Sequence, residues 1–186
     1  MRFSLLLIAL LIPSFLHGTE EAYPRTPAGT LETKTLPAAR LLRTSSPKGY
    51  FESNNGLFMN LFRYIQANRI PMTAPVEAGI QPGTMFFYVH STRRERLDSS
   101  NGVDPVEAPA RSVAAIGVRG SYTKKNFDTA LTQLKAWLAQ RPALIPQGEP
   151  YAVYWNSPFV PGFLKHSEVH IPLAPASDRS KSVPVH

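Results

Sequence analysis

The sequence contains no cysteine among its 186 residues. This absence excludes disulfide bonds, thiolate zinc sites, iron–sulfur clusters, cysteine nucleophiles and covalently attached c-type haem. Glycine is also sparse, with 11 residues against 18 prolines. Because proline is excluded from helix interiors and central strands, the high proline count argues against an all-helical bundle. It predicts many short helices and strands with bends at the connections between them.

Long runs of positive charge are absent as well, although the formal net charge is +7. The densest basic cluster is Arg93, Arg94 and Arg96, which Glu95 interrupts. A groove for a polyanion usually needs a basic stripe interleaved with aromatic residues or glycine. We therefore expect no nucleic-acid partner and attribute the charge to scattered surface lysines and arginines.

The common catalytic signatures are missing too. The sequence has no G-x-S-x-G, no H-E-x-x-H, no G-x-G-x-x-G and no Walker-type glycine loop. A Ser/His/Asp site can be assembled from distant positions, so this absence is weak evidence against an enzyme. Nothing in the sequence positively indicates a nucleophile, and we expect a protein without catalysis of its own.

Residues 1–18 have the layout of a secretory signal peptide. Arg2 precedes a short apolar run over residues 5–12, and a small-residue region ending at Gly18 follows. The run is too short to span a bilayer, but the end of the segment is a poor cleavage site, which leaves an uncleaved anchor as the alternative. We expect an exported protein, periplasmic or secreted, that is tethered to a membrane only if this segment is retained.

The rest of the chain is expected to form one domain with polar flanks. Residues 19–28 are interpreted as a solvated linker, residues 29–173 as the domain, and residues 174–186 as a polar tail containing proline. The fraction of hydrophobic residues, 43%, is sufficient for a packed core. No segment after residue 18 is long and apolar enough to be transmembrane.

Two helices stand out in this domain, over residues 55–67 and 123–140, because their apolar residues recur at helical spacing. Thr123 is a candidate N-cap. Strands are expected over residues 31–44, 73–79, 85–90, 110–122, 151–156 and 169–173. The order strand, helix, strand, strand therefore occurs twice. The segments LPAARLL (36–42) and APARSVA (108–114) echo each other, which supports a duplicated α+β unit with helices on a curved antiparallel sheet.

The first helix is more apolar than a helix that covers one face of a sheet needs to be. Only a narrow polar stripe remains between its apolar residues. These apolar residues are Leu57, Phe58, Met59, Leu61, Phe62, Tyr64 and Ile65. One explanation is burial by the proline-rich loops. The other is a flat hydrophobic ligand that lies against Met59 or Phe62, with Arg63 on the rim available to a carboxylate.

Two segments resemble motifs of the SOUL haem-binding protein family. Residues 70–76 (IPMTAPV) resemble the stretch I-A-M-T-A-P-V, and residues 154–173 (YWNSPFVPGFLKHSEVHIPL) resemble the closing Y-N-S-P-F-x-P-x-F-x-R-x-N-E-V-W-I-P. The resemblance also includes residues 107–111 and spans essentially the whole domain. It implies two pseudo-symmetric βαββ repeats that form a distorted antiparallel β-barrel flanked by two helices, as in the gyrase-inhibitor-like effector-binding superfamily.

The resemblance also implies that the protein binds haem or another tetrapyrrole. An apolar groove between the first helix (Met59, Phe62) and the closing loop over residues 158–164, which includes Phe163, would then stack on the porphyrin. Arg63 and Lys165 would pair with its propionates.

The iron ligand does not follow from the resemblance. Where the family often has Arg, Asn and Trp, this sequence has His166, Ser167 and His170. A neutral imidazole is a common ligand of haem iron, and His90, His166 and His170 are the histidines of the expected domain. We favour His166 because it follows Lys165 in the closing loop, and we keep His170 and His90 as alternatives.

Two other functions stay open. The likeness to gyrase-inhibitor-like domains suggests that Glu168 binds a cationic aromatic ligand or acts as the general base of a small-molecule hydrolase. A structural role for Glu168, accepting hydrogen bonds from the backbone of the closing loop, is the simpler alternative. The third possibility is a protein-interaction module without a small ligand.

Overall fold

Short strands and two helices make up the described part of the computed structural model, which consists of residues 20–53, 55–90, 92–93 and 95–175. The expected signal peptide (1–18) and nearly all of the expected tail lie outside these residues. The helical elements are α1 (Leu57–Ala67), α2 (Lys124–Ala139) and the 3-10 turn η1 (Gly162–Leu164). The strands are β1 (Glu20–Glu21), β2 (Leu31–Leu36), β3 (Ala39–Ser46), β4 (Thr73–Ala74), β5 (Val76–Gly79), β6 (Gly83–Tyr88), β7 (Val103–Ala108), β8 (Arg111–Arg119), β9 (Tyr151–Tyr154) and β10 (His166–Pro172).

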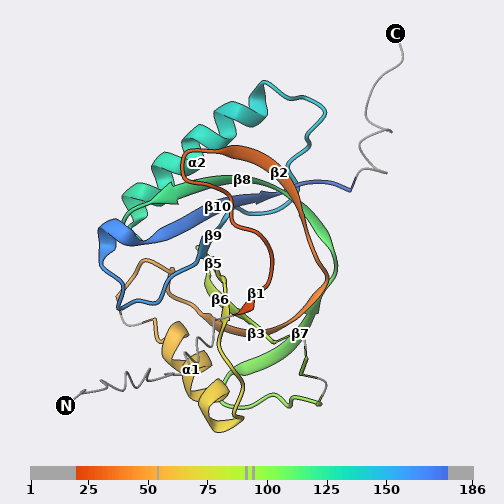
Figure 1. The fold of residues 1–186 in the computed structure, drawn as a ribbon, viewed down its shortest axis with the longest axis vertical. Coiled ribbons are helices and arrows are strands. Elements are labelled where there is room, and N and C mark those ends of the chain that lie inside the picture. Colours follow the sequence, from red (N-terminus) through yellow and green to blue (C-terminus); the bar gives the residue numbers. More distant parts are fainter. Residues whose placement is uncertain (1–19, 54, 91, 94, 176–186) are drawn as a thin grey trace, which may run out of the picture.

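Eight of these strands form one curled antiparallel sheet with the two helices on its outside (Figure 1). The strand order is β2-β8-β10-β9-β5-β6-β3-β7. The first half of the chain supplies β2, β3, α1, β5 and β6, and the second half repeats this order with β7, β8, α2, β9 and β10. The helix α1 packs on β3 and β6, and α2 packs on their counterparts β8 and β10. The structure confirms the expected duplicated α+β fold.

The sheet curls into a distorted barrel. The strands at the two ends of the sheet order, β2 and β7, are each followed in the chain by a strand from the interior of that order, β3 and β8. The strand β2 leads through Pro37 into β3, and β7 leads through Pro109 into β8. The pairs Leu36–Arg111 and Ala39–Ala108 belong to one uninterrupted register. The two halves therefore pair along one long, bent ladder. A proline lacks the N–H that a ladder needs, so the bends fall at Pro37 and Pro109, which is where the sequence echo lies.

The helices begin and end near the expected positions. The Thr123 hydroxyl accepts a hydrogen bond from the backbone N–H of Asn126 (3.2 Å), so Thr123 is the N-cap of α2. The buried residues of α1 are Leu57, Leu61, Tyr64 and Ile65, and those of α2 are Phe127, Ala130, Leu134 and Leu138. Neither of these described helices has the length and apolar character that crossing a membrane requires.

The strands differ from expectation where prolines fall. The predicted strand 31–44 is divided at Pro37, and the predicted strand 73–79 is divided at Pro75. The strand β7 was not expected, because its sequence VDPVEA contains a proline and two acidic residues. It lies at one end of the sheet order and pairs only with β3, which is a position that tolerates proline.

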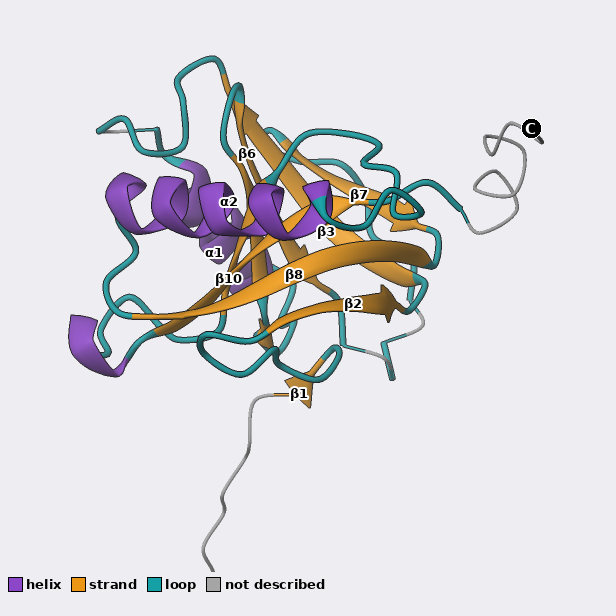
Figure 2. Ribbon diagram, turned by 90° about the horizontal axis from the view of Figure 1, so that it is seen from above, coloured by secondary structure: helices purple, strands orange, loops and turns teal. Residues whose placement is uncertain are grey.

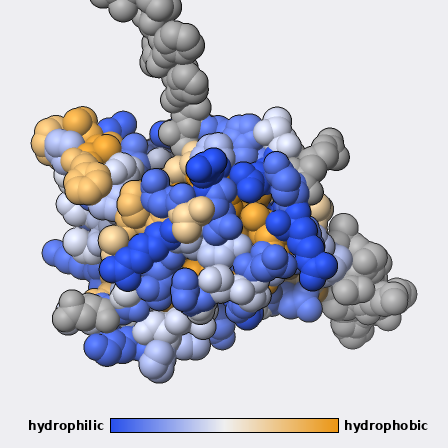
Figure 3. All heavy atoms as spheres, turned by 90° about the horizontal axis from the view of Figure 1, so that it is seen from below, coloured by the Kyte–Doolittle hydropathy of each residue, from blue (hydrophilic) through white to orange (hydrophobic). Residues whose placement is uncertain are grey.

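The loop between β9 and β10 projects from the body of the protein and carries η1 at its tip (Figure 2). The surface seen in Figure 3 is mainly hydrophilic, and hydrophobic side chains gather at one protruding corner of it. The exposed large hydrophobic residues of this loop are Phe159, Phe163 and Leu164.

The N-terminal segment over residues 20–30 packs on the barrel, whereas the sequence indicated a solvated linker over residues 19–28. The strand β1 pairs in parallel with β4, and Ala28 forms a bridge to Gly117. The side chains of Tyr23 and Thr26 are buried. A Cβ atom at Gly117 would lie 2.2 Å from the carbonyl oxygen of Pro27, so this approach requires glycine. The segment is held mainly by hydrogen bonds, which explains why its polar composition suggested a linker.

The carboxylate of Glu168 anchors this segment. It accepts hydrogen bonds from the backbone N–H of Thr26 (2.8 Å), the Thr26 hydroxyl (3.0 Å), Lys34 Nζ (2.6 Å) and Trp155 Nε1 (2.7 Å). His170 Nε2 lies 2.6 Å from Oε2 of the same group. Burial opposes the charged form of Glu168, but hydrogen bonds and charge from His170 and Lys34 outweigh it and lower the pKa from 4.5 to about 2. Glu168 therefore has the structural role that we considered, although its backbone partner is in the N-terminal segment.

We expect the free energy of unfolding to fall in acid because of this group. The folded-state pKa of Glu168 is lower than the unfolded value, so the stabilisation is complete above about pH 4.5 and is lost as the pH falls toward 2. Glu168→Gln replaces one acceptor oxygen by an NH2 group, which would face other hydrogen-bond donors. This substitution should lower the free energy of unfolding at pH 7 by on the order of 3 kcal/mol. The difference from the wild type should shrink below pH 4.5 in urea unfolding at several pH values.

The matched control is Glu107→Gln on β7, which removes an exposed carboxylate and should change stability by less than about 0.5 kcal/mol. Equal stability of Glu168→Gln and the wild type at pH 7 would contradict the anchoring role.

Candidate functional site

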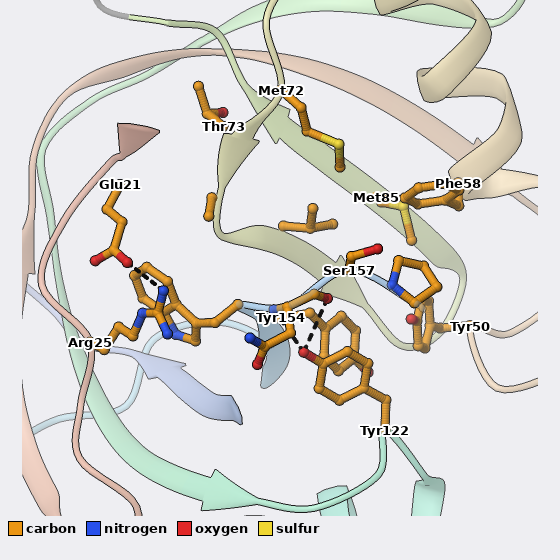
Figure 4. A pocket seen from close by; sticks show the side chains of 15 residues that line it. Glu21, Arg25, Tyr50, Phe58, Met72, Thr73, Met85, Tyr122, Tyr154 and Ser157 are labelled. Atoms are coloured by element: carbon orange, nitrogen blue, oxygen red, sulfur yellow. Dashed lines mark hydrogen bonds and ion pairs between the residues drawn. The ribbon is translucent and has the colours of Figure 1, made fainter. Parts of the chain in front are cut away.

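A cavity of about 560 Å³ lies between α1, the strands β4 to β6, the N-terminal segment and the start of the β9–β10 loop (Figure 4). Its size is within the range of sites for small organic ligands. The lining residues come from both halves of the chain: Glu21, Arg25, Tyr50, Phe58, Met72, Thr73, Ala74, Val76, Met85, Tyr122, Tyr154, Trp155, Asn156, Ser157 and Pro158.

Three tyrosines form one wall of this cavity. The ring centroids of Tyr122 and Tyr154 are 4.2 Å apart, and Tyr50 stacks on Tyr154 at 5.4 Å. The Tyr122 hydroxyl donates to the carbonyl oxygen of His166 (3.0 Å) and accepts from the backbone N–H of Asn156 (2.9 Å). These bonds fix the Tyr122 ring across the start of the β9–β10 loop. The wall is therefore a rigid aromatic surface suited to stacking.

The opposite wall is apolar and contains sulfur. Phe58 from α1, Val76 from β5 and Met85 from β6 line it, together with Met72 from the segment that precedes β4. The labelled side chains of Met72, Met85 and Phe58 lie on the same side of the cavity in Figure 4. The backbone register pairs Val76 with Tyr154, so the two walls meet where β5 of the first half joins β9 of the second.

One cation lies at the edge of the cavity. The guanidinium of Arg25 lies 4.9 Å from the centroid of the Trp155 ring, and it forms an ion pair with Glu21. Arg25 is exposed, whereas Trp155 is buried and donates its ring N–H to Glu168. Glu168 thus fixes one lining residue directly, and it holds Arg25 near the cavity through the neighbouring Thr26.

The Tyr154 hydroxyl is a buried polar group that faces this set of residues. Only 7% of Tyr154 is exposed, and its hydroxyl has no hydrogen-bond partner with acceptable geometry among the described residues. Burial, and then the neighbouring Tyr50, raise the pKa of Tyr154. Burial also raises the pKa of Tyr122 to about 12, against the opposing effect of its backbone partners. Both phenols are protonated at neutral pH, and the Tyr154 hydroxyl is buried within the wall beside Tyr50.

The residues predicted on the first helix do not line the cavity. Met59 is 45% exposed and Arg63 is exposed, and Arg63 borders a separate hollow with Asn60 and Ser100. Phe62 stacks on Phe58 with ring centroids 5.8 Å apart. The sequence identified the correct helix, but the rotation of α1 turns Phe58 toward the cavity. The binding roles of Met59, Phe62 and Arg63 stay predictions.

The residues predicted in the closing loop lie behind or beyond the cavity wall. Phe163 is 73% exposed. Lys165 Nζ donates to the carbonyl oxygen of Pro158 (3.0 Å) and lies 4.9 Å from the centroid of the Tyr122 ring. His166 Nε2 lies 2.8 Å from the carbonyl oxygen of Thr26. None of the three is among the lining residues, and their roles in ligand binding also stay predictions.

The two alternative histidines make contacts within the protein. His170 is fully buried, with Nε2 on Glu168 and Nδ1 3.1 Å from the Tyr151 hydroxyl. His90 Nε2 contacts a carboxylate oxygen of Glu20, and its Nδ1 lies 2.8 Å from the Thr92 hydroxyl. In the part of the chain that the structure describes, no group of three His, Asp or Glu side chains is arranged to hold a metal ion. The two sulfur atoms of the cavity were not considered from the sequence, because methionine spacing carries no signal.

A second buried carboxylate was also missed. Glu77 on β5 accepts hydrogen bonds from the Tyr88 hydroxyl (2.6 Å) and from Arg111 Nη2 at both of its oxygens (2.6 and 2.8 Å). Its sequence context, VEAG, resembles an ordinary strand in which the glutamate side chain points to solvent. Glu77 and Glu168 both contact protein donors and neither lines the cavity; the carboxylate that does line it, Glu21, is exposed and paired with Arg25.

Several solved structures share this fold at low sequence identity. The chain matches a cryo-EM structure of the EcmrR–DNA complex with a TM-score of 0.63 and 11% identity, covering 77% of this chain and 57% of that one. It matches a crystal structure of the EcmrR C-terminal domain with a TM-score of 0.58 and 12% identity, covering 78% and 97%. A crystal structure of a hydrolase from Listeria innocua has a TM-score of 0.56 and 10% identity, covering 80% and 94%.

These similarities show a shared fold and no more than the fold. The chain spans a little over half of the first of these proteins and nearly all of the other two. No curated protein matches the chain in sequence. The sequence profile described as "SOUL heme-binding protein" matches residues 21–172, which is most of the chain and includes both halves of the barrel. The protein belongs to the SOUL haem-binding protein family.

Proposed function

We propose that this protein binds haem or a related tetrapyrrole in the cavity between the two halves of the barrel, as a non-catalytic binding or carrier protein. The observation that carries the proposal is the cavity itself, because it combines a wall of three tyrosines, a second apolar wall and the cation of Arg25 at its edge. A planar macrocycle needs two facing apolar walls. Its propionates need a cation near solvent, which Arg25 supplies.

The lining residues also suit a metallated macrocycle. The thioethers of Met72 and Met85 are neutral ligands of a kind that haem iron accepts. A bound haem supplies an iron centre that exchanges an electron or an axial ligand. The chain's own contribution is to hold the macrocycle away from water and to compensate its charge.

The first prediction from this proposal concerns the volume of the cavity. Val76→Trp places a large side chain between the two walls and should weaken haem binding at least tenfold, which is about 1.4 kcal/mol. Met59→Trp, on the outer surface of α1, should leave binding unchanged. Haem titration followed by the Soret band measures both, and thermal unfolding checks that each variant is folded.

If Val76→Trp is too unstable to titrate, Phe58→Ala and Met59→Ala replace the pair, since these neighbours on α1 face toward and away from the cavity. Weakened binding in the Met59 variants alone would contradict the cavity site. That result would favour the outer surface formed by Met59, Phe62 and Arg63.

The second prediction concerns the iron. Met72→Leu and Met85→Leu keep the side-chain size but remove sulfur, so the variant that loses the axial ligand should bind haem at least tenfold more weakly. Its affinity for metal-free protoporphyrin should be unchanged, because that ligand has no iron. Absorbance titrations with both ligands provide the comparison.

His166→Ala, His170→Ala and His90→Ala belong in the same series. A haem-specific loss in His166→Ala with no loss in the methionine variants would identify His166 as the ligand and contradict thioether ligation.

We further propose that the protein is exported, because a positive charge and a short apolar run precede residue 19. The mature chain should begin near Thr19. Intact-mass measurement on protein expressed with its own N-terminus and separated by cell fractionation tests this. Recovery from the cytoplasm of a chain that retains residues 1–18 would be the contrary result.

A further inference from the structure

We propose that the β9–β10 loop is a membrane anchor, which inserts Phe159, Phe163 and Leu164 into the surface of a bilayer that contains anionic lipids. The proposal concerns an interaction surface outside the cavity and does not depend on which ligand the cavity binds. It rests on the exposure of the three side chains, the rigidity of the loop, its shape and the charges around its base.

The exposure of these side chains is the primary observation. Phe159 is 93% exposed, Phe163 73% and Leu164 49%. Only Met59, at 45%, joins them among the exposed large hydrophobic residues in the described part of the chain. Single exposed apolar residues are ordinary, but three within six positions form a cluster that in soluble proteins usually marks an interaction site.

The loop is held in the conformation that exposes them. The backbone N–H of Val160 donates to Ser157 (3.1 Å), that of Leu164 to Pro161 (2.9 Å), and that of Gly120 to the carbonyl of Lys165 (3.0 Å). Lys165 Nζ closes the loop on the Pro158 carbonyl. This loop is fixed by turns and two prolines, so binding requires little further ordering.

The shape of the loop favours a bilayer over a folded partner. The loop projects beyond the sheet with η1 at its tip (Figure 2), and the hydrophobic corner in Figure 3 is convex. A helix or strand of a protein partner docks in a groove or along a sheet edge, and this tip is neither. A few apolar side chains on a projection suit the boundary between lipid head groups and acyl chains.

Positive charges surround the base of the loop. Arg119 pairs with His166 in the β8–β10 register and is exposed, and Lys165 is the last residue before β10. Lys125 is exposed in the first turn of α2, and Ser121, which precedes this helix, has its side chain against Gly162 of η1. Cations near an apolar tip attract anionic head groups at the depth where the phenyl rings enter.

The absence of cysteine allows a test that reads insertion at one site. In the full chain, Phe159→Cys is labelled with an environment-sensitive fluorophore and mixed with vesicles of phosphatidylcholine, with or without phosphatidylglycerol. Met59→Cys, at the other exposed hydrophobic residue, is the matched control. The label at position 159 should shift to the blue and be quenched by lipid-borne quenchers in the anionic vesicles. The label at position 59 should not respond.

A second variant measures how much the loop contributes to binding. Phe159→Ser combined with Phe163→Ser should reduce co-sedimentation with anionic vesicles at least tenfold, while thermal stability stays unchanged because both rings are exposed. All variants keep residues 1–18, so any membrane affinity of that segment is common to them. Added salt should weaken the binding of the unsubstituted chain.

Three results would overturn the proposal. One is equal responses of the labels at positions 159 and 59, and another is undiminished sedimentation of the double variant. The third is a protein that ignores vesicles but self-associates in sedimentation velocity until the two phenylalanines are replaced. That outcome would make the loop a contact between copies of the chain.

Discussion

The buried carboxylate of Glu168 sets the position of the parts that form the candidate site. A charge without access to solvent is tolerated only when donors surround it, and here those donors come from the N-terminal segment, β2, β10 and the residue after β9. Satisfying this one group brings Thr26, Lys34 and Trp155 together. Arg25 and Trp155, which both line the cavity, are therefore fixed by the same electrostatic requirement that closes the fold.

The duplicated architecture explains why a cavity exists at that place. Each half of the chain covers its own strands with its own helix, and the two halves meet at the pairing of β5 with β9. The first half contributes Tyr50, Phe58 and both methionines to the cavity, and the second half contributes Tyr122, Tyr154 and Trp155. The sequences of the two repeats have diverged while their backbones still correspond. A symmetric fold thus gives an asymmetric site.

The cavity and the projecting loop are consecutive in the chain. Asn156, Ser157 and Pro158 line the cavity, and the exposed Phe159 follows directly. Hydrogen bonds of Tyr122 and Lys165 fix this junction, so the loop is held relative to the aromatic wall. An apolar ligand and an apolar environment outside the protein would meet at the same end of the barrel.

The sequence by itself determined the two helices, the Thr123 cap, the duplicated order of elements and the family, because these depend on periodicity and on local motifs. It also identified the first helix as unusually apolar. Only the tertiary structure decided that Phe58 of this helix faces the cavity, since the rotation of a helix depends on what packs against it. The burial of Thr26 and the presence of Met72 and Tyr154 in one cavity likewise depend on contacts between residues far apart in the chain. A sequence pattern does not show which distant residues come into contact. Strand pairing across the sheet and the hydrogen-bond donors around a buried charge are set only when the chain is folded.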